Sequence, residues 1–276
     1  MNFLLPAVIA LGGMGIVSAL ILYFVAKKFE VREDPRIAEI LSLLPAANCG
    51  GCGYPGCSGF ASACVKATTL DGLLCPVGGT ATMSGIAAVL GQSAVECEPT
   101  IAVVYCNGSR DKRTITNIYE GAANCAITSA LYGGETACPY GCLGFGDCVT
   151  ACLFNSIRIN PETLLPEIDE DQCTSCGACI KACPRQLIQL RKKGPDSRRI
   201  YVGCMNKDKG AIARKACNVA CIGCSKCQKN CESEAITIID NLAVIDESKC
   251  TLCGKCVEEC PTSSIVEHLK TKTVLC

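Results

Sequence analysis

Cysteine is the residue that most constrains this chain, since 27 of its 276 residues are cysteines. A content this high is typical either of small disulfide-bonded scaffolds or of proteins rich in bound metal. The chain is long enough for about two or three small domains, which is too long for one disulfide-bonded scaffold. The odd number of cysteines also excludes complete pairing into disulfides. Metal-bound thiolates are therefore the favoured use of these residues.

An apolar segment at residues 3–26 contains no charged residue. At a helical rise of about 1.5 Å per residue it covers roughly 36 Å, enough to cross a hydrocarbon core of about 30 Å. A cleaved signal peptide is the alternative, and it requires a basic region before the apolar run. Here the basic residues follow the run, at Lys27, Lys28 and Arg32. We therefore expect a transmembrane anchor at residues 1–28.

The positive-inside rule places the basic side of this anchor in the cytoplasm and the N-terminus outside. Every cysteine lies after the anchor, so all of them are expected on the reducing side, where metal ligation is favoured over disulfides. The sequence thus predicts a single-pass protein of the inner (cytoplasmic) membrane. Basic and acidic residues number 26 each, which argues against the basic surface that nucleic-acid binding requires.

Four groups of closely spaced cysteines occupy the C-terminal half of the chain. Two of them, Cys173–Cys183 and Cys250–Cys260, have the spacing C-x2-C-x2-C-x3-C followed by proline. Cys221–Cys231 keeps this spacing, with Glu232 in place of proline, and Cys138–Cys152 is stretched to C-x3-C-x5-C-x3-C. Zinc binds two separated C-x2-C pairs and has no use for a third and fourth cysteine in one group. We therefore interpret the four groups as ligands of iron–sulfur clusters.

The segment that begins at Cys148 is repeated in the segment that begins at Cys227. Both run from a cysteine group through two short β-rich stretches and an aspartate to a second cysteine group. The first stretches, residues 156–159 and 235–239, predict strands that end in tight turns. Two copies of one small α+β unit are the economical explanation of this repeat.

These groups resemble those of the bacterial two-cluster ferredoxin family, in which three close thiols bind one [4Fe-4S] cube and the fourth binds the neighbouring cube. The resemblance implies two ferredoxin-like βαββαβ units, at residues 99–190 and 191–276, with two cubes in each. The crossed ligand sets that it implies are Cys138, Cys142, Cys148 and Cys183; Cys173, Cys176, Cys179 and Cys152; Cys221, Cys224, Cys227 and Cys260; and Cys250, Cys253, Cys256 and Cys231.

A different cysteine group lies within residues 29–98. The stretch LPAANCGGCGYPGC holds Cys49, Cys52 and Cys57, and Cys75 follows directly before a proline. This pattern resembles the small four-cysteine [4Fe-4S] domain of the B subunits of Rnf complexes. In that family a membrane anchor, this domain and ferredoxin repeats follow one another in the order found here. The resemblance covers nearly the whole chain, which has two ferredoxin units where the shortest members have one.

Seven cysteines remain outside these five sets. Cys106 and Cys125 lie upstream of one cluster group as Cys204 and Cys217 lie upstream of another, and we consider a further metal site at these four. Small buried core residues are the ordinary alternative, because free cysteine packs well in protein interiors. Cys64, on an expected helix, is interpreted as a buried thiol. No role is predicted for Cys97 and Cys276.

The sequence contains no G-x-G-x-x-G, no P-loop and no Ser/His/Asp arrangement, so it indicates no nicotinamide, flavin or nucleotide site and no catalytic residue. Five [4Fe-4S] clusters instead predict about 20 irons and a role in electron transfer. The Rnf resemblance implies an electron-transfer subunit of a redox-driven ion translocase between reduced ferredoxin and NAD. Its partners would be soluble ferredoxin and the NAD-binding, flavin-binding and integral membrane subunits.

Two other functions stay open on the sequence alone. A polyferredoxin relay could reduce a different target, such as a redox regulator or another membrane dehydrogenase. A purely structural metal protein is the second, and it would contain no reducible cluster.

Overall fold

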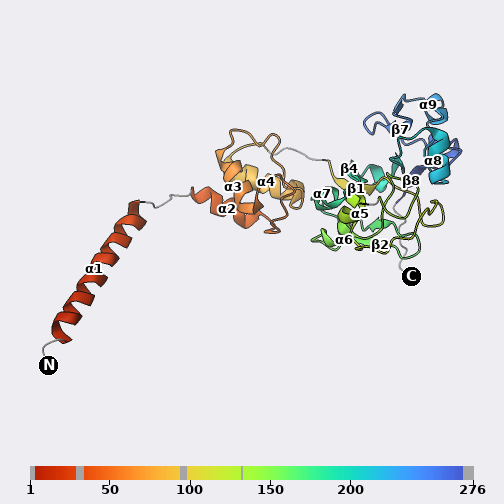
Figure 1. The fold of residues 1–276 in the computed structure, drawn as a ribbon. Coiled ribbons are helices and arrows are strands. Elements are labelled where there is room, and N and C mark those ends of the chain that lie inside the picture. Colours follow the sequence, from red (N-terminus) through yellow and green to blue (C-terminus); the bar gives the residue numbers. More distant parts are fainter. Residues whose placement is uncertain (1–3, 29–33, 94–97, 132, 270–276) are drawn as a thin grey trace, which may run out of the picture.

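The computed structural model describes residues 4–28, 34–93, 98–131 and 133–269. A long N-terminal helix is followed by a small helical module and then by two mixed α and β units (Figure 1). This order of elements confirms the predicted fold class: an apolar helix, a four-cysteine module and two ferredoxin-like units.

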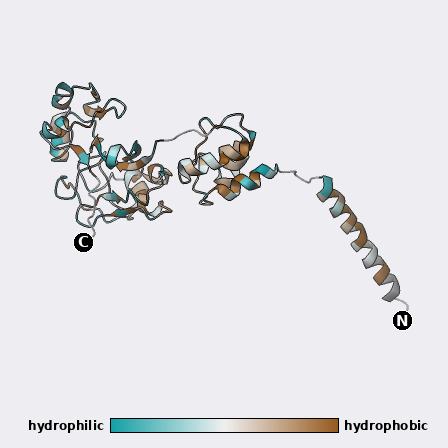
Figure 2. Ribbon diagram, turned by 180° about the vertical axis from the view of Figure 1, so that it is seen from behind, coloured by the Kyte–Doolittle hydropathy of each residue, from teal (hydrophilic) through white to brown (hydrophobic). Residues whose placement is uncertain are grey.

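Helix α1 (Leu4–Lys28) is apolar along most of its length and ends in two lysines (Figure 2). Its segment Leu11–Lys28 is long and apolar enough to cross a membrane, and none of that segment is buried inside the protein. Leu22 and Phe24, for example, each expose more than half of their surface. Contact of apolar surface with water costs about 25 cal/mol per Å². Lipid cover removes this cost, so the helix suits a membrane.

Three helices build the module that follows: α2 (Pro35–Leu43), α3 (Gly56–Lys66) and α4 (Gly79–Leu90). They pack on one another through the buried side chains of Ile40, Phe60 and Met83. Helix α2 begins at a proline, and the side chain of Asp34 caps it by accepting a hydrogen bond from Arg36 N. Helix α4 is not predicted from the sequence, although Met83 and Ile86 form its buried face at helical spacing.

The first ferredoxin-like unit contains two antiparallel strand pairs and short helices. Its elements are β1 (Thr100–Val104), α5 (Cys125–Leu131), α6 (Asp147–Thr150), β2 (Ile157–Ile159), β3 (Pro166–Ile168), α7 (Ala178–Ala182) and β4 (Ile188–Lys192). Strand β1 pairs with β4, and β2 pairs with β3 as the inner hairpin. Strand β4 ends at Lys192, so the first unit extends past the boundary predicted at residue 190.

The second unit repeats this topology after a short 3-10 turn, η1 (Pro195–Ser197). Its elements are β5 (Arg199–Val202), α8 (Gly210–Ala216), α9 (Lys226–Lys229), β6 (Ile236–Ile239), β7 (Leu242–Ile245), α10 (Lys255–Glu258) and β8 (Ile265–His268). Strand β5 pairs with β8 and β6 with β7. Asp240 and Asn241 connect β6 to β7 with positive φ angles of 49° and 61°, as a two-residue hairpin turn requires. The predicted repeat and its turn are thus confirmed.

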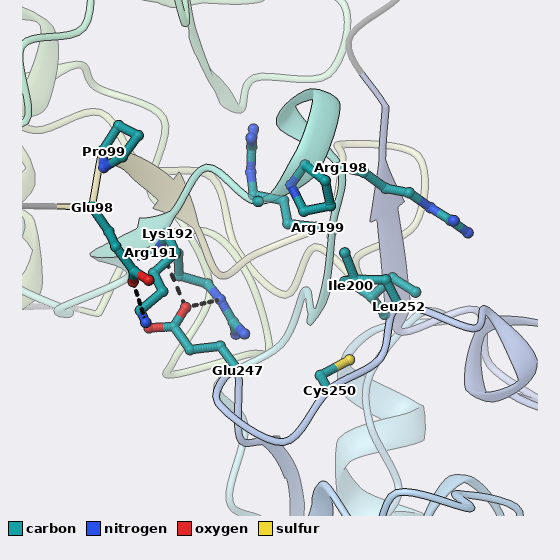
Figure 3. A pocket seen from close by; sticks show the side chains of 12 residues that line it. Glu98, Pro99, Arg191, Lys192, Arg198, Arg199, Ile200, Glu247, Cys250 and Leu252 are labelled. Carbon is teal, nitrogen blue, oxygen red and sulfur yellow. Dashed lines mark hydrogen bonds and ion pairs between the residues drawn. The ribbon is translucent and has the colours of Figure 1, made fainter.

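A pocket beside strand β4, between the two units, is rich in ion pairs (Figure 3). Arg191, at the end of β4, donates to Glu247 of the second unit at 3.2 Å. The other basic side chains of the pocket are paired as well: Lys192 with Glu98, Arg198 with Glu267, and Arg199 with Glu170. Each cation of the pocket thus has a carboxylate partner, so its charges serve to join parts of the chain.

Candidate metal centres

The helical module brings its four predicted ligands around one cavity. Cys49, Cys52, Cys57 and Cys75 all line it. The loop between the thiols is held by Asn48, whose side-chain oxygen accepts a 2.8 Å hydrogen bond from the backbone N–H of Cys57. Cys64 is fully buried on α3 and does not line the cavity. The interpretation of Cys64 as a buried thiol is therefore confirmed.

Replacing Cys75 with serine is expected to lower the iron content by about four atoms, one cube, and to leave the ferredoxin-like units loaded. The physical reason is that this module has its own core and its own four thiols, and metal binding is coupled to local folding. Iron analysis with low-temperature EPR after dithionite reduction measures the change. Cys64→Ser is the matched control and should keep every cube. Loss of all EPR signals in Cys75→Ser would show that the modules depend on one another.

In the first ferredoxin-like unit, one crossed ligand set comes together around Cys179. Burial, and then the neighbouring thiols, raise the pKa of Cys179 to about 12. Those neighbours are Cys173, Cys176, Cys148 and Cys152. A thiol with so high a pKa stays protonated at neutral pH until a metal displaces the proton, and the thiolate is the form that binds metal. Cys152 thus lies with the group formed by Cys173, Cys176 and Cys179.

The second unit gathers its cysteines in the same crossed way. Burial and neighbouring thiols raise the pKa of Cys227 to about 11 and that of Cys256 to about 12. The thiols around Cys227 are Cys221, Cys224 and Cys260. Those around Cys256 are Cys250, Cys253 and Cys231, together with Cys227 itself. The fourth cysteine of each sequence group therefore lies beside the other group.

Serine hydroxyls lie beside two of the crossing cysteines, Cys152 and Cys260, and cysteine spacing does not indicate them. The sulfur of Cys152 lies 3.2 Å from Ser156 Oγ, and that of Cys260 lies 3.3 Å from Ser264 Oγ. Burial alone would raise the pKa of Cys260, but the Ser264 hydroxyl and nearby backbone N–H groups outweigh it and lower the pKa. Donors around the sulfur favour the thiolate, which is the ligand form. A serine four residues after the fourth cysteine could have marked these positions.

The remaining cavity of the first unit differs from the predicted ligand set in one member. Cys142, Cys148 and Cys183 line it as expected, but the fourth cysteine in its wall is Cys125. Cys138 lines a separate cavity instead. The structure therefore brings together three of the four cysteines of the set Cys138, Cys142, Cys148 and Cys183.

Hydrogen bonds between the starts of α5 and α6 explain why Cys125, and not Cys138, lines this cavity. Asp147, at the start of α6, accepts hydrogen bonds from the backbone N–H groups of Cys125 at 2.9 Å and Ala126 at 3.1 Å. Its carboxylate thereby fixes the start of α5 next to Cys148. Because 22 residues separate the two partners, cysteine spacing alone could not indicate the contact.

In the ranges that the structure describes, no three side chains of His, Cys, Asp or Glu converge closely enough to hold one ion, and the 25 described cysteines are all free thiols. Zinc requires each thiolate about 2.3 Å from one point. The thiolates of a cube bind four different irons and stand further apart. Each cysteine set supplies four thiolates, one for each iron of a [4Fe-4S] cube, and this donor set fits such a cluster.

The binding loop of the helical module touches a binding loop of the first ferredoxin-like unit, the one that holds Cys173, Cys176 and Cys179. A Cβ atom at Gly51, between Cys49 and Cys52, would lie 2.7 Å from the carbonyl oxygen of Cys176 and 3.0 Å from its Cα. No side chain fits at such distances without a shift of backbone. The glycine thus lets the loop of the helical module contact the loop of the first ferredoxin-like unit.

Family models match three segments that contain these sites. Residues 44–71 match a putative Fe-S cluster domain, residues 165–188 match a 4Fe-4S binding domain, and residues 220–264 match a 4Fe-4S dicluster domain. These matches support iron–sulfur clusters as the groups that the cysteines bind.

Curated relatives match nearly the whole chain. The B subunit of the Na⁺-translocating ferredoxin:NAD⁺ oxidoreductase complex of Acetobacterium woodii is 40% identical over 96% of this chain and 78% of its own length. The B subunit of the ion-translocating oxidoreductase complex of Methanosarcina acetivorans is 39% identical over 96% of this chain and 98% of its own. That of the proton-translocating ferredoxin:NAD⁺ oxidoreductase complex of Clostridium ljungdahlii is 39% identical over 96% of this chain and 93% of its own. Similarity of this extent, on a chain with an apolar N-terminal helix and repeated cluster sites, shows that the chain belongs to the family of iron–sulfur B subunits of Rnf-type ion-translocating oxidoreductase complexes.

Proposed function

We propose that this chain is the membrane-bound relay that takes electrons from reduced ferredoxin and passes them toward the NAD-reducing subunits of an ion-translocating complex. The observation that carries the proposal is the repeated gathering of four cysteines from segments that lie apart in the sequence. Two relatives that are similar over 96% of this chain carry ferredoxin and NAD⁺ in their names. The cysteine sets and these names support a role in electron transfer between the two.

Five [4Fe-4S] cubes have ligand sets in this proposal. The sets are Cys49, Cys52, Cys57 and Cys75; Cys125, Cys142, Cys148 and Cys183; Cys173, Cys176, Cys179 and Cys152; Cys221, Cys224, Cys227 and Cys260; and Cys250, Cys253, Cys256 and Cys231. The second set contains Cys125 where the sequence alone favours Cys138.

A [4Fe-4S] cube, when bound, accepts and returns one electron at a potential that its surroundings set. The chain supplies those surroundings. The backbone N–H of Gly78 donates to the sulfur of Cys75 at 3.4 Å, and that of Leu187 donates to Cys183 at 3.4 Å. Such donors disperse the negative charge of the thiolates and thereby favour electron uptake. Burial of Cys148 and Cys179 keeps water from the sulfurs.

We also propose that residues 1–28 anchor the chain in the inner membrane with all cluster domains on the cytoplasmic side. The lysines that end α1 support this orientation, because cytoplasmic flanks of membrane helices are enriched in basic residues. The proposed domains are residues 29–98, which hold the first cube, and two units that meet just after strand β4.

Complementation tests this function directly. Membranes from a strain without its native B subunit should regain NADH formation from reduced ferredoxin when the loaded full-length chain is present. The expected rate is near that of native membranes, because the relay is the missing connection. The matched control is Cys173→Ala/Cys176→Ala, which keeps the anchor and loses one cube. Restoration by this variant would contradict the proposed path, and no restoration by the loaded chain would contradict the function.

A further inference from the structure

We propose that Cys106, Cys138, Cys204 and Cys217 bind a sixth iron–sulfur cube at the junction of the two ferredoxin-like units. All four line one cavity, which is similar in size to the cavity assigned above to Cys125, Cys142, Cys148 and Cys183. Cys138, Cys204 and Cys217 each expose less than a tenth of their surface. This site adds to the five cubes of the proposed function and does not depend on the partners named there.

The backbone brings these four cysteines together without a metal. Cys106 and Cys204 each follow the first strand of their unit by two residues, and Asn107 N donates to Gly203 O between them at 2.8 Å. The segment after Cys106 then pairs with the segment that contains Cys217. Thr114 N donates to Ala216 O at 3.0 Å, and Asn218 N donates to Lys112 O at 2.7 Å. The site is therefore built from both units.

Hydrogen-bond donors surround the sulfurs as they do at the other sites. Asn206, only 1% exposed, donates through its backbone N–H to Cys204 Sγ at 3.4 Å and through its side chain to Cys138 Sγ at 3.5 Å. Donors at cluster sulfurs tune the potential of a cube. A buried asparagine that serves two cysteines from different units is well explained by such a centre.

Arg113 supplies a positive charge at the same place. Its Nη1 donates to the carbonyl oxygen of Cys142 at 2.7 Å, while its Nε is buried and has no hydrogen-bond partner among the described residues. The guanidinium lines the cavity and lies close enough to Cys106 and Cys217 to act on their charge. A buried cation with an unsatisfied donor is costly unless an acceptor or anion is nearby. Four thiolates on a cube would provide that negative charge.

The proposed site also touches a ligand of each adjoining cube. The backbone N–H of Cys142 donates to Cys106 Sγ at 3.4 Å, and that of Cys221 acts as a donor to the sulfur of Cys204. Cys142 belongs to the first unit and Cys221 to the second. The sixth cube would take one electron from a reduced cube in one unit, which is thereby oxidised, and then reduce a cube in the other. No proton or bond needs to change in this transfer.

The test is the iron and sulfide content of the full-length chain, reconstituted anaerobically in detergent. The wild type should hold about 24 irons and 24 sulfides, and Cys138→Ala/Cys217→Ala should hold about 20 of each. Cys64→Ala, at a cysteine as deeply buried but outside every proposed cube, should equal the wild type. A double variant equal to the wild type would overturn the site.

Other outcomes are equally decisive. Loss of two cubes in the double variant would place Cys138 on the neighbouring cube and overturn the separate site, as would zinc in place of iron. Native mass spectrometry of the wild type counts cubes without any substitution, so misfolding of the variant does not remove the test. Six cubes are expected there, and five would overturn the inference.

Discussion

Deletion of residues 1–28 is expected to reduce ferredoxin-dependent NAD reduction by membranes to near the background rate, while every cube remains bound. In the described part of the chain, α1 is the one helix long and apolar enough to cross a membrane, so the deletion removes the proposed anchor. No proposed ligand precedes Cys49, and ligation should therefore survive. Electron transfer falls steeply with distance, and a released relay spends little time beside its partners.

The measurement adds equal amounts of the full-length or truncated chain to membranes without the native B subunit and follows NADH formation. An unrelated single-span helix of the same orientation, fused in place of residues 1–28, is the matched control and should restore the rate. Full activity of the truncated chain at stoichiometric amounts would show that the helix is dispensable. Precipitation of the truncated chain would show a second membrane-facing surface.

Gly51→Ala is expected to slow the same reaction strongly without loss of iron. The new Cβ would lie 2.7 Å from the carbonyl oxygen of Cys176 and 3.0 Å from Pro76 Cγ. Overpacking of this kind typically costs about 1–3 kcal/mol, and the chain can relieve it by separating the two loops. The distance then grows between the cube of the helical module and the cube proposed at Cys173, Cys176, Cys179 and Cys152. Electron transfer between these two cubes becomes slower.

Gly85→Ala is the matched control, because its Cβ would meet the flexible end of the Leu43 side chain at 3.3 Å rather than backbone. Stopped-flow reduction by ferredoxin, with iron analysis of each variant, measures the effect. Equal rates in Gly51→Ala and Gly85→Ala would show that electrons do not pass through this contact. Iron loss in Gly51→Ala would mean that the glycine serves ligation instead.

Local spacing predicts much of this molecule. In a group such as Cys250–Cys260, a few loop residues and one short helix position every thiol. The local fold of the group, and the fact that its fourth cysteine binds the neighbouring cube, can therefore be inferred from this one stretch. The apolar run at residues 3–26 likewise needs no tertiary contact to predict a helix. The β6–β7 hairpin follows from Asp240 and Asn241 at its turn.

Contacts between distant segments account for what spacing could not predict. The sequence groups Cys106, Cys125, Cys204 and Cys217, whereas in the structure Cys138 lines the cavity of Cys106, Cys204 and Cys217, and Cys125 lines that of Cys142, Cys148 and Cys183. The exchange depends on the carboxylate of Asp147, which binds the start of α5. The spacing of the cysteines carries no information about this hydrogen bond, because Asp147 and Cys125 lie 22 residues apart.

The contact at Gly51 has a consequence for the whole set of centres. Suppose that electrons pass at this contact to the cube that Cys176 binds, and that the sixth cube connects the two ferredoxin-like units. The cubes then form a single series, and electrons have no alternative route around any one of them. The slowest single transfer between two cubes then limits the overall rate of electron transfer. Damage to one cube stops electron transfer through the whole series. Cys224 and Cys253, both exposed, lie at the C-terminal end of this series. Oxygen would therefore attack first at a terminus, and a single oxidised cube there would switch off the entire chain.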